Sequence, residues 1–587
     1  MEKVISYLKP YRWAMLMAWA LMLVELAVEL WHPMFMANII DEGILKQDLN
    51  AVMKWGGIMI GMSLLGFIAG ITNSFFSAHA SQGVGFDVRA AVFKKVQSFS
   101  FNNLAQFQTS SLITRLTNDI TQIQNTLFMS LRVALRTPLL IIGGVTMAFF
   151  VNIKLALILI VPIPVLVALL FWMMRKTGKL FRLVQDKLDR VNNVMQENLT
   201  SMRLIKAFIR KDFEEKRFGT ANEDLRKHTV KTLRLVELLG PLLLLIMNLA
   251  ILFILWFAAA DVHQARINVG EVVAIVNYGF RITMALSMLS WIIMAFSRGK
   301  ASSGRINEIL QTSVDLEDNA SALSDKRIRA GKVKFQNVSF KYPGTDNFVL
   351  RNISFTANPG ETIAVMGATG AGKSALFQLI PRLYDVNEGF IEIDDFDIRN
   401  MTLTSLRKQI GFVPQESILF TGSVESNIAW GKEDASHEEM IKSTKDAQIH
   451  ETIQRLPKGY QTKVGQKGVN LSGGQKQRLS IARALVRTPK LLFLDDSTSA
   501  LDMKTEAKLL EALEKYDSTI FIITQKITTA MKTDQILLLD EGELVACGTH
   551  EELMKSSALY QKIYTSQFTK GGLADVQKKK NGAAAGG

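Results

Sequence analysis

The chain has 587 residues, 48% of them hydrophobic, and a formal net charge of +14 at pH 7. This length allows at least two domains. The basic residues gather beside apolar segments, a pattern typical of membrane proteins that disfavours a nucleic-acid-binding protein.

Six apolar segments are long enough to cross a bilayer as helices. They are expected at about 13–38, 52–79, 128–150, 153–174, 233–259 and 271–297. The loop 39–51 is acidic, whereas 80–127 and 175–232 are rich in Lys and Arg. The basic stretches and both termini are therefore predicted to lie in the cytosol. The first segment is too long for the apolar region of a cleavable signal peptide, so none is expected.

The first segment contains two acidic residues, Glu25 and Glu29, which are one helical turn apart and share a face. Acids inside a membrane are costly and usually face a cavity or a partner. An unpaired carboxylate in an apolar cavity would favour cationic amphipathic substrates. A position near the outer interface is the alternative for Glu29 and for His32. Further candidates for a substrate cavity are Asn248, Asn277 and Arg281.

The polar segment 311–330 is predicted to be a linker. It would join a transmembrane domain at 1–310, with helical extensions beyond the bilayer, to a second domain at 331–567. The tail 568–587 is expected to be disordered, and its AAAGG end resembles a cloning remnant. The single cysteine, Cys547, excludes an internal disulfide and is expected in the core of the second domain.

The second domain begins with a phosphate-binding pattern. A short apolar strand is expected at 361–366, followed by GATGAGKS at 367–374 and a helix at 375–383. This order is the context of a P-loop, in which glycines let backbone N–H groups converge on phosphates. Lys373 is expected to reach the β- and γ-phosphates, and Ser374 to ligate Mg²⁺. The predicted loop comprises Gly367, Ala368, Thr369, Gly370, Ala371, Gly372, Lys373, Ser374 and Ala375.

Two more segments accompany this loop: LSGGQ at 471–475, and an apolar strand that ends in Asp495 and Asp496. The three segments together resemble the nucleotide-binding domain of ATP-binding cassette (ABC) proteins, and the whole chain resembles an ABC exporter half-transporter. This resemblance implies a six-helix transmembrane domain fused to an α/β P-loop cassette. It also implies ATP and Mg²⁺ as cofactors, and a multi-pass position in the plasma (inner) membrane with the cassette in the cytoplasm.

The resemblance assigns roles to single positions. Tyr342 matches the aromatic residue that stacks on adenine, and Asp495 matches the Mg²⁺-associated carboxylate. Gln415 matches the glutamine that touches Mg²⁺ and a coupling helix. The Mg²⁺ ligands would therefore be Ser374, Gln415 and Asp495. The signature residues Ser472, Gly473, Gly474 and Gln475 would hold the γ-phosphate of an ATP bound to a partner's P-loop.

Two cytosolic turns match the coupling helices of the family, at 101–118 and 205–216. The first of them, Phe101–Gln108, would dock on the nucleotide domain. A solvated amphipathic turn is the alternative.

Two catalytic positions depart from the family pattern. The family places Glu after the strand-end Asp to polarise the attacking water, whereas Asp496 is shorter by one C–C bond, about 1.5 Å. A displacement of about 1 Å at a reacting centre costs about 10²-fold in rate. Gln525 replaces a histidine that contacts the γ-phosphate, and a glutamine carries neither a proton nor a positive charge.

The chain thus resembles the degenerate-site subunit of bacterial heterodimeric multidrug exporters. It would be an ATPase-coupled transporter with a weakly hydrolytic site of its own, paired with a competent half-transporter and acting on hydrophobic or cationic amphipathic compounds. Two other readings stay open: a lipid or peptide exporter of the same architecture, and a non-transporting ABC-type regulator. A homodimer would have two weak sites.

Overall fold

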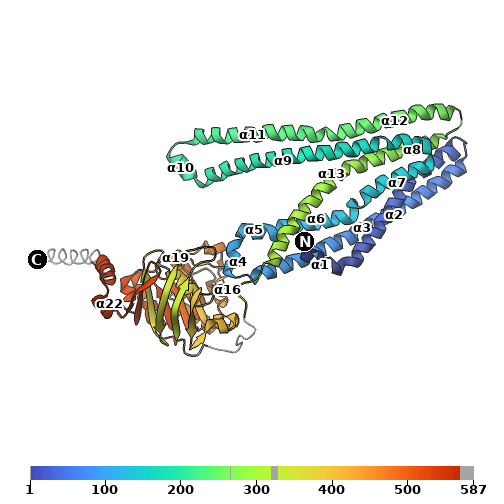
Figure 1. Ribbon diagram of the computed structural model, residues 1–587. Coiled ribbons are helices and arrows are strands. Elements are labelled where there is room, and N and C mark those ends of the chain that lie inside the picture. Colours follow the sequence, from blue (N-terminus) through green and yellow to red (C-terminus); the bar gives the residue numbers. More distant parts are fainter. Residues whose placement is uncertain (1, 265, 319–327, 569–587) are drawn as a thin grey trace. The chain divides into compact units, whose positions relative to one another are not determined.

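The computed structural model describes residues 2–264, 266–318 and 328–568 (Figure 1). It divides into two units. Unit 1 comprises Met1–Ser98 and Phe107–Thr312, and unit 2 comprises Phe99–Gln106 and Ser313–Gly587. The expected tail from residue 569 onward and the middle of the expected linker, 319–327, lie outside the described residues.

Unit 1 is built of helices. In chain order they are α1 (Glu2–Ser6), α2 (Arg12–Asn38), α3 (Leu49–Gln97), α5 (Thr109–Thr114), α6 (Ile120–Met129), α7 (Arg136–Val151), α8 (Ile153–Ile160), α9 (Pro162–Thr200), α10 (Met202–Ala207), α11 (Lys211–Glu237), α12 (Leu239–His263) and α13 (Val269–Gln311). Six stretches of the described chain are long and apolar enough to cross a membrane: Lys3–Ile44, Leu49–Gln97, Thr109–Val151, Ile153–Thr200, Lys211–His263 and Val269–Gln311. Each contains one expected span, so the predicted transmembrane helical fold is confirmed.

Side chains from the loops start two of these helices. The Asp48 carboxylate accepts from the backbone N–H groups of Asn50 and Ala51 at the start of α3. The Asn152 side chain does the same for Lys154 and Leu155 at the start of α8. Such caps satisfy donors that have no partner within the helix. The short connections therefore end one span and begin the next within a few residues.

Glu25 and Glu29 are paired, so the expectation of an unpaired carboxylate is wrong. Arg136, at the start of α7, donates to Glu25 Oε1 at 2.8 Å and to Glu29 Oε2 at 2.6 Å. Arg281 of α13 lies 3.0 Å from the other oxygen of Glu29. Gly70 of α3 leaves room for the Glu25 carboxyl group, whose carbon would lie 3.4 Å from a Cβ at that position. The four charged residues Glu25, Glu29, Arg136 and Arg281, here called the charge quartet, join three spans and have no net charge.

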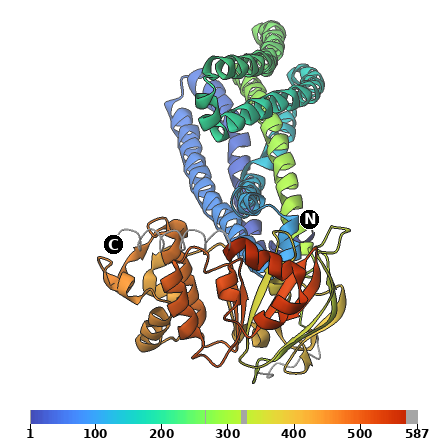
Figure 2. The same ribbon diagram turned by 90° about the vertical axis from the view of Figure 1, so that its left-hand side faces the viewer.

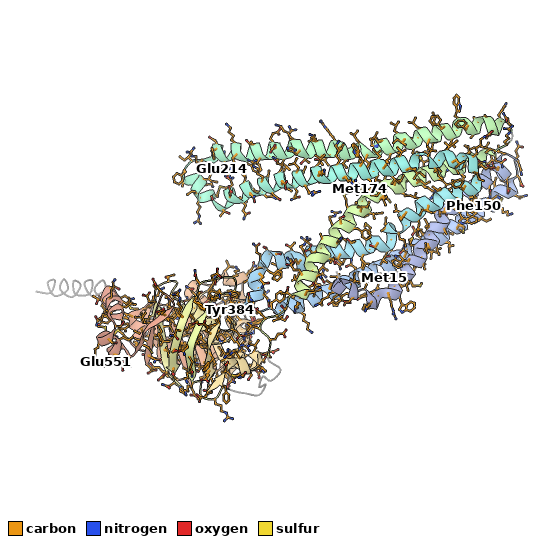
Figure 3. The ribbon with its side chains drawn as sticks, in the orientation of Figure 1. Met15, Phe150, Met174, Glu214, Tyr384 and Glu551 are labelled. Carbon is orange, nitrogen blue, oxygen red and sulfur yellow. The ribbon has the colours of Figure 1, made fainter. Side chains whose placement is uncertain are left out.

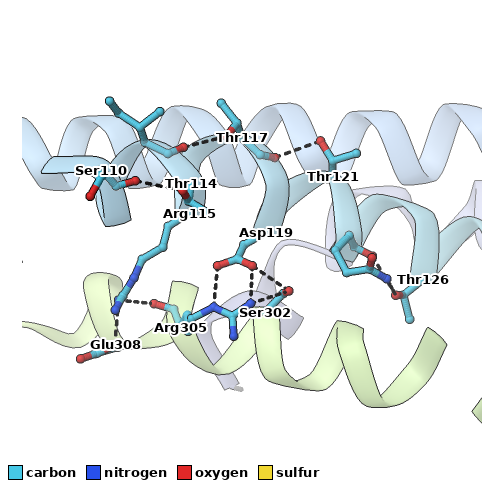
Figure 4. A network of polar contacts seen from close by, with 12 residues as sticks. Ser110, Thr114, Arg115, Thr117, Asp119, Thr121, Thr126, Ser302, Arg305 and Glu308 are labelled. Atoms are coloured by element: carbon cyan, nitrogen blue, oxygen red, sulfur yellow. Dashed lines mark hydrogen bonds and ion pairs between the residues drawn. The ribbon is translucent and has the colours of Figure 1, made fainter. Parts of the chain in front are cut away.

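A second polar network joins the third and sixth spans (Figure 4). Arg305 donates from Nε and Nη2 to the carboxylate of Asp119 at 2.7 and 2.5 Å, and the Ser302 hydroxyl donates to the same group at 2.8 Å. Asp119 is only 4% exposed. One turn earlier, Arg115 donates to Glu308 Oε2 at 2.7 Å. The last turns of α13 are therefore fixed to the segment that follows α5.

The described residues of unit 2 contain α4 (Phe101–Gln106), a six-stranded sheet, a four-stranded sheet and a two-stranded pair. In its described residues the larger sheet has six strands in the order β12-β11-β3-β10-β9-β6. They are β3 (Thr362–Gly367), β6 (Ile410–Val413), β9 (Leu491–Asp495), β10 (Thr519–Ile523), β11 (Gln535–Asp540) and β12 (Glu543–Gly548). Only β12 runs antiparallel to its neighbour. Strands β9 and β10 are buried along their whole length, which explains their continuous apolar runs.

The smaller sheet is antiparallel, with the order β2-β1-β4-β5. Its strands are β1 (Val333–Phe340), β2 (Leu350–Ala357), β4 (Glu388–Ile393) and β5 (Phe396–Asp397), and the short pair β7 (Gly422–Ser423) and β8 (Lys463–Val464) stands apart from it. The helices are α14 (Lys373–Leu379), α15 (Leu403–Lys408), α16 (Val424–Ala429), α17 (His437–Asp446), α18 (His450–Gln454), α19 (Gly473–Leu485), α20 (Met503–Leu513), α21 (Ile527–Ala530) and α22 (His550–Ser556). Figure 2 shows the orange helical part of this unit beside the yellow strands. The predicted α/β cassette is confirmed.

Three phenylalanines hold the first helix after β3 against the sheet. The ring of Phe377 in α14 lies 5.3 Å from Phe493 of β9 in an edge-on arrangement, and Phe493 stacks on Phe521 of β10 at 5.1 Å. Aromatic pairs at this spacing stabilise a core beyond the area they bury. Cys547 is exposed on β12, so the expectation that it lies in the core is wrong: β12 is an edge strand with one face open to solvent.

We predict that Arg136→Met lowers the apparent melting temperature of the purified protein in detergent. The substitution leaves Glu25 without its cation, and breaking a buried ion pair costs about 3–5 kcal/mol. We expect the lower end of that range, because the Arg136 side chain keeps about a quarter of its exposure. The control is Arg136→Met with Glu25→Gln, which removes both charges and should recover most of the loss. Equal melting temperatures for Arg136→Met and the unchanged protein would contradict a structural role for the charge quartet.

Candidate nucleotide-binding site

The loop between β3 and α14 has the backbone of a phosphate-binding turn. Three of its glycines have positive φ angles: 150° at Gly367, 90° at Gly370 and 93° at Gly372. A Cβ at Gly372 would lie 2.6 Å from the side chain of Leu350, and one at Gly367 would lie 2.2 Å from the carbonyl oxygen of Leu539. Glycine is thus required both by conformation and by space.

Lys373 begins α14 and folds back over this loop. Its ammonium group donates to the carbonyl oxygens of Gly367 at 2.9 Å and Ala368 at 2.6 Å. Burial lowers the pKa of Lys373, while the neighbouring Asp495 and Asp496 oppose that shift. The positive charge of Lys373 is therefore paired only with neutral carbonyl oxygens. Phosphate oxygens can replace these carbonyls as acceptors and form stronger, charge-assisted hydrogen bonds.

Most of the predicted site residues meet in one cleft of about 280 Å³, here called the phosphate cleft. Its walls include the loop after β3, the start of α14 and the ends of β9 and β10. The predicted residues that line it are Tyr342, Thr369, Gly370, Gly372, Lys373, Ser374, Ala375, Gln415, Asp495, Asp496 and Gln525. Gly367, Ala368 and Ala371 belong to the loop but do not line the cleft. Val349 and Ile523 line it and were not singled out by the sequence.

Two adjacent carboxylates stand at the floor of the cleft. Asp495 ends β9 and is 8% exposed, and the Ser374 hydroxyl donates to it over a long 3.4 Å. Burial raises the pKa of Asp495, and the charge of Asp496 adds to this rise. Burial also raises the pKa of Asp496, against the attraction of Lys526 and Lys373. A cation placed here would relieve this unfavourable charge.

The donors at this position fit Mg²⁺. Ser374, Gln415 and Asp495 present a hydroxyl, an amide oxygen and a carboxylate to one cleft. Mg²⁺ prefers oxygen ligands and is usually held by one or two carboxylates together with waters and substrate phosphates. In the described residues there is no cluster of three or more His, Cys, Asp or Glu side chains that would make an all-protein metal site. The cleft therefore suits a cation that arrives with a nucleotide.

A buried ion pair near Asp496 was missed by sequence reasoning. Lys526 donates to Glu506 Oε2 at 2.6 Å and to the carbonyl oxygen of Thr498 at 3.2 Å. Glu506, in α20, is 4% exposed, and the Thr529 hydroxyl donates to its other oxygen at 2.9 Å. Glu506 is thus neutralised, hydrogen-bonded and absent from the cleft lining. It does not substitute for the family's glutamate at position 496.

Hydrogen bonds between Gln567 and the backbone fix the position of Gln525. Its backbone carbonyl accepts from Gln567 Nε2 at 2.7 Å, and the Gln567 amide oxygen accepts from the backbone N–H of Ile527 at 2.9 Å. Gln567 belongs to the helical stretch 558–568 near the end of the described chain. The loop that carries Gln525 into the cleft is therefore held by a segment more than forty positions later.

The signature residues lie elsewhere in unit 2. Ser472 caps α19, and the Gln475 side chain accepts from the backbone N–H of Ser472 at 2.8 Å. Ser472 and Gly473 are exposed, and none of Ser472–Gln475 is among the residues that line the phosphate cleft. The start of a 13-residue helix offers free N–H groups and a positive dipole end. These N–H groups lie outside the lining of this chain's own phosphate cleft.

Comparisons with known proteins agree with this geometry. The chain matches the ABC transporter transmembrane region over residues 15–286 and the ABC transporter family over residues 350–499. The chain belongs to the ABC transporter family. Its fold and family make it an ABC exporter half-transporter with an ATP-binding cassette, and an ATPase-coupled transporter.

Individual relatives cover nearly the whole chain. The ABC transporter ATP-binding protein YfiB of Bacillus subtilis (strain 168) is 56% identical over 97% of this chain and 99% of its own length. YgaD of the same organism, named as a proposed multidrug export ATP-binding/permease protein, is 32% identical over 97% and 99%. A solved bacterial Atm1-family ABC exporter with ATP bound superposes with a TM-score of 0.78 at 27% identity, covering 95% of this chain and 98% of that one.

We predict that Asp495→Asn raises the apparent melting temperature of the nucleotide-free protein at neutral pH. Because burial raises the pKa of Asp495 in the fold, its ionised form costs free energy that asparagine does not. The penalty exists only while the carboxyl group is ionised, so the difference should shrink as the pH falls towards that pKa. The same substitution should abolish the extra stabilisation that Mg²⁺ gives in the presence of ATP. Thermal unfolding from about pH 8 to about pH 5 measures both effects, and a lower melting temperature at neutral pH would contradict this account.

Proposed function

We propose that this chain is one subunit of an ATP-driven heterodimeric efflux pump for amphipathic drugs or other hydrophobic compounds. It binds ATP with Mg²⁺ at its own phosphate cleft, hydrolyses it poorly, and supplies Ser472–Gln475 to the competent site of a second half-transporter. The pump lies in the plasma (inner) membrane with the cassette in the cytoplasm.

The observation that carries this proposal is the composition of the phosphate cleft. The residues expected to bind the nucleotide gather there, among them Lys373 and Ser374, yet the two catalytic positions hold Asp496 and Gln525. The nearby carboxylate of Glu506 is committed to Lys526. The site thus keeps the means to hold ATP and lacks a long carboxylate to activate water.

Two exposed surfaces support a partner subunit. The first is the start of α19, where Ser472 and Gly473 are exposed and do not line the phosphate cleft of this chain. The second is the turn between α9 and α11, two helices that run side by side with α10 at their tip (Figure 1). There Ile209 is 88% exposed and has a φ angle of 54°, a strained conformation for a β-branched residue. Strain of this kind persists at functional sites.

The tip also contains a cavity of about 630 Å³. Glu214 marks this end of α11 in Figure 3. The apolar residues that line it are Met195, Leu199, Met202, Ile205, Ile209 and Phe218. A large apolar surface at the end of a long hairpin is typical of a docking site. We assign it to the nucleotide domain of the partner.

The proposed substrate class rests on the apolar spans of unit 1 and on the name of one relative. The name of the relative YgaD supports multidrug export. The charge quartet is internally compensated, with Arg136 and Arg281 against Glu25 and Glu29. A preference for cations is therefore not part of the proposal.

We predict that the chain purified alone binds ATP–Mg²⁺ tightly but turns over slowly. Asp496→Glu combined with Gln525→His should raise its ATPase rate by about 10²-fold, because the pair restores the reach of the base and a proton-carrying group. The measurement is steady-state phosphate release in detergent. Fast turnover by the unchanged chain, lost on Asp496→Asn, would mean that the site is fully competent.

We predict that Ser472→Ala or Gly473→Asp in this chain strongly lowers the ATPase of the pair, since the signature serves the partner's transition state. The matched control is Ser436→Ala, which removes the equivalent capping box from α17 without touching the signature. Both serine variants lose helix stability, about 1 kcal/mol, but only Ser472→Ala should lose turnover. Unchanged turnover of the reconstituted pair on Ser472→Ala would refute the shared site.

A further inference from the structure

The segment after Gln311, the last residue of α13, clamps the short helix α4. The carboxylate of Asp315 accepts a hydrogen bond from the Ser100 hydroxyl on one oxygen and from Asn102 Nδ2 on the other. Asn103, which is buried, donates to the backbone carbonyl of Ser313 at 3.1 Å. Both segments belong to unit 2. Three side-chain bonds therefore join a helix and a linker that are more than two hundred positions apart.

The clamp is ionic on one side. Burial alone would raise the pKa of Asp315, but the hydrogen bonds from Ser100 and Asn102 outweigh it and lower that pKa. Asp315 is thus an ionised group with neutral donors. Hydrogen bonds to a charged group are roughly twice as strong as those between neutral groups.

Aromatic rings lead from α4 to the nucleotide site. The ring of Phe101 lies 6.0 Å from Tyr384, and Tyr384 lies 5.4 Å from Tyr342, which lines the phosphate cleft. Beside this row is a cavity of about 620 Å³ whose walls include Asn102, Asp315, Tyr342 and Tyr384. Because the rings lie beside a cavity, they are not packed tightly on every side. The hydrogen bonds of Asp315 therefore provide the main attachment of α4.

The neighbouring parts of the chain, just after α4 and just before Ser313, are tied together within unit 1. The chain enters unit 1 after Gln106 and leaves it at Thr312. Inside unit 1, Asp119 holds Arg305 and Arg115 holds Glu308 (Figure 4). The helix and the linker are joined in unit 2, and the chain segments that continue them into unit 1 are joined there by separate ion pairs.

We propose that Asp315 is a positioning residue for coupling: it makes α4 and the segment after α13 move as one piece with the nucleotide site around Tyr342. This inference rests on the proposed export function. When ATP binds beside Tyr342, the clamp carries the movement into both chain segments that enter unit 1. Without the clamp, α4 can shift independently, and hydrolysis proceeds with less transport.

The test compares three substitutions in the reconstituted pair. Asp315→Ala removes the clamp. Asp315→Asn is the conservative variant, because the Asn102 amide can turn to pair with it. Asp318→Ala is the matched control, because this substitution removes the same charge from the same segment. The Asp318 carboxylate accepts a hydrogen bond from the backbone N–H of Leu403 and not from α4.

We expect Asp315→Ala to keep nucleotide affinity and basal ATPase within about twofold, and to lower the amount transported per ATP by about fivefold or more. Asp315→Asn and Asp318→Ala should keep most of the transport. If Asp315→Ala does not fold, Asn102→Ala replaces it with the same expectation. Unchanged transport per ATP in Asp315→Ala, or equal loss in Asp318→Ala, would overturn the proposal.

A second measurement separates this inference from the proposed function. Hydrogen exchange of the amides of residues 99–106 should slow on ATP binding in the unchanged protein and stay fast in Asp315→Ala. This readout needs no transported substrate. If the unchanged pair exports no hydrophobic compound but shows this difference, the proposed function fails and the clamp stands. If both proteins exchange alike, the clamp fails whatever the pair exports.

Discussion

The nucleotide site depends on the parallel pairing of three buried strands. Ile523 of β10 is in register with Asp495 of β9 on one side and with Val365 of β3 on the other. The next residues along the chain from these strands therefore leave the sheet at one edge, where the carboxyl ends of parallel strands place ligands. The P-loop, Asp496 and Gln525 come together for this reason. One methylene group at position 496 matters because the pairing fixes the backbone from which that side chain extends.

In unit 1 the structure depends on ion pairs between helices, as unit 2 depends on the pairing of its strands. Acids are expensive in a membrane and persist where a partner or a cavity compensates them. Arg136 compensates two glutamates at once, and Gly70 provides the space. Asp119 and Arg305 repeat this solution near the other end of the spans. These paired polar groups thus explain how the helices of unit 1 hold together.

Local patterns predicted most of the fold and much of the site. The six spans follow from runs of apolar residues, and the P-loop follows from glycines that neighbouring atoms and positive φ angles require. The missed features all depend on contacts between distant positions. Arg136 lies inside an expected span, and an arginine there was the available signal that the glutamates have a partner. Glu506 lies on an ordinary amphipathic helix, and only the fold brings Lys526 to it.

The assignment of Phe99–Gln106 to unit 2 is another feature that local sequence patterns cannot predict. Its sequence is a short polar-aromatic helix, and resemblance alone indicated a docking role. The residues that hold it, Asp315 and Ser313, follow it in the sequence only after four further spans. No periodicity within α4 could have revealed them.

The central claim is that this chain holds ATP without consuming it, and the fate of the γ-phosphate tests it directly. The tagged chain is purified with the subunit that accompanies it, and the pair is loaded with photoreactive ATP labelled on either the α- or the γ-phosphate. After one round of turnover the nucleotides are crosslinked and the two subunits are separated. We predict equal α- and γ-label on this chain, because its ATP stays intact, and loss of the γ-label from its partner. Loss of the γ-label from this chain at the partner's rate would contradict it.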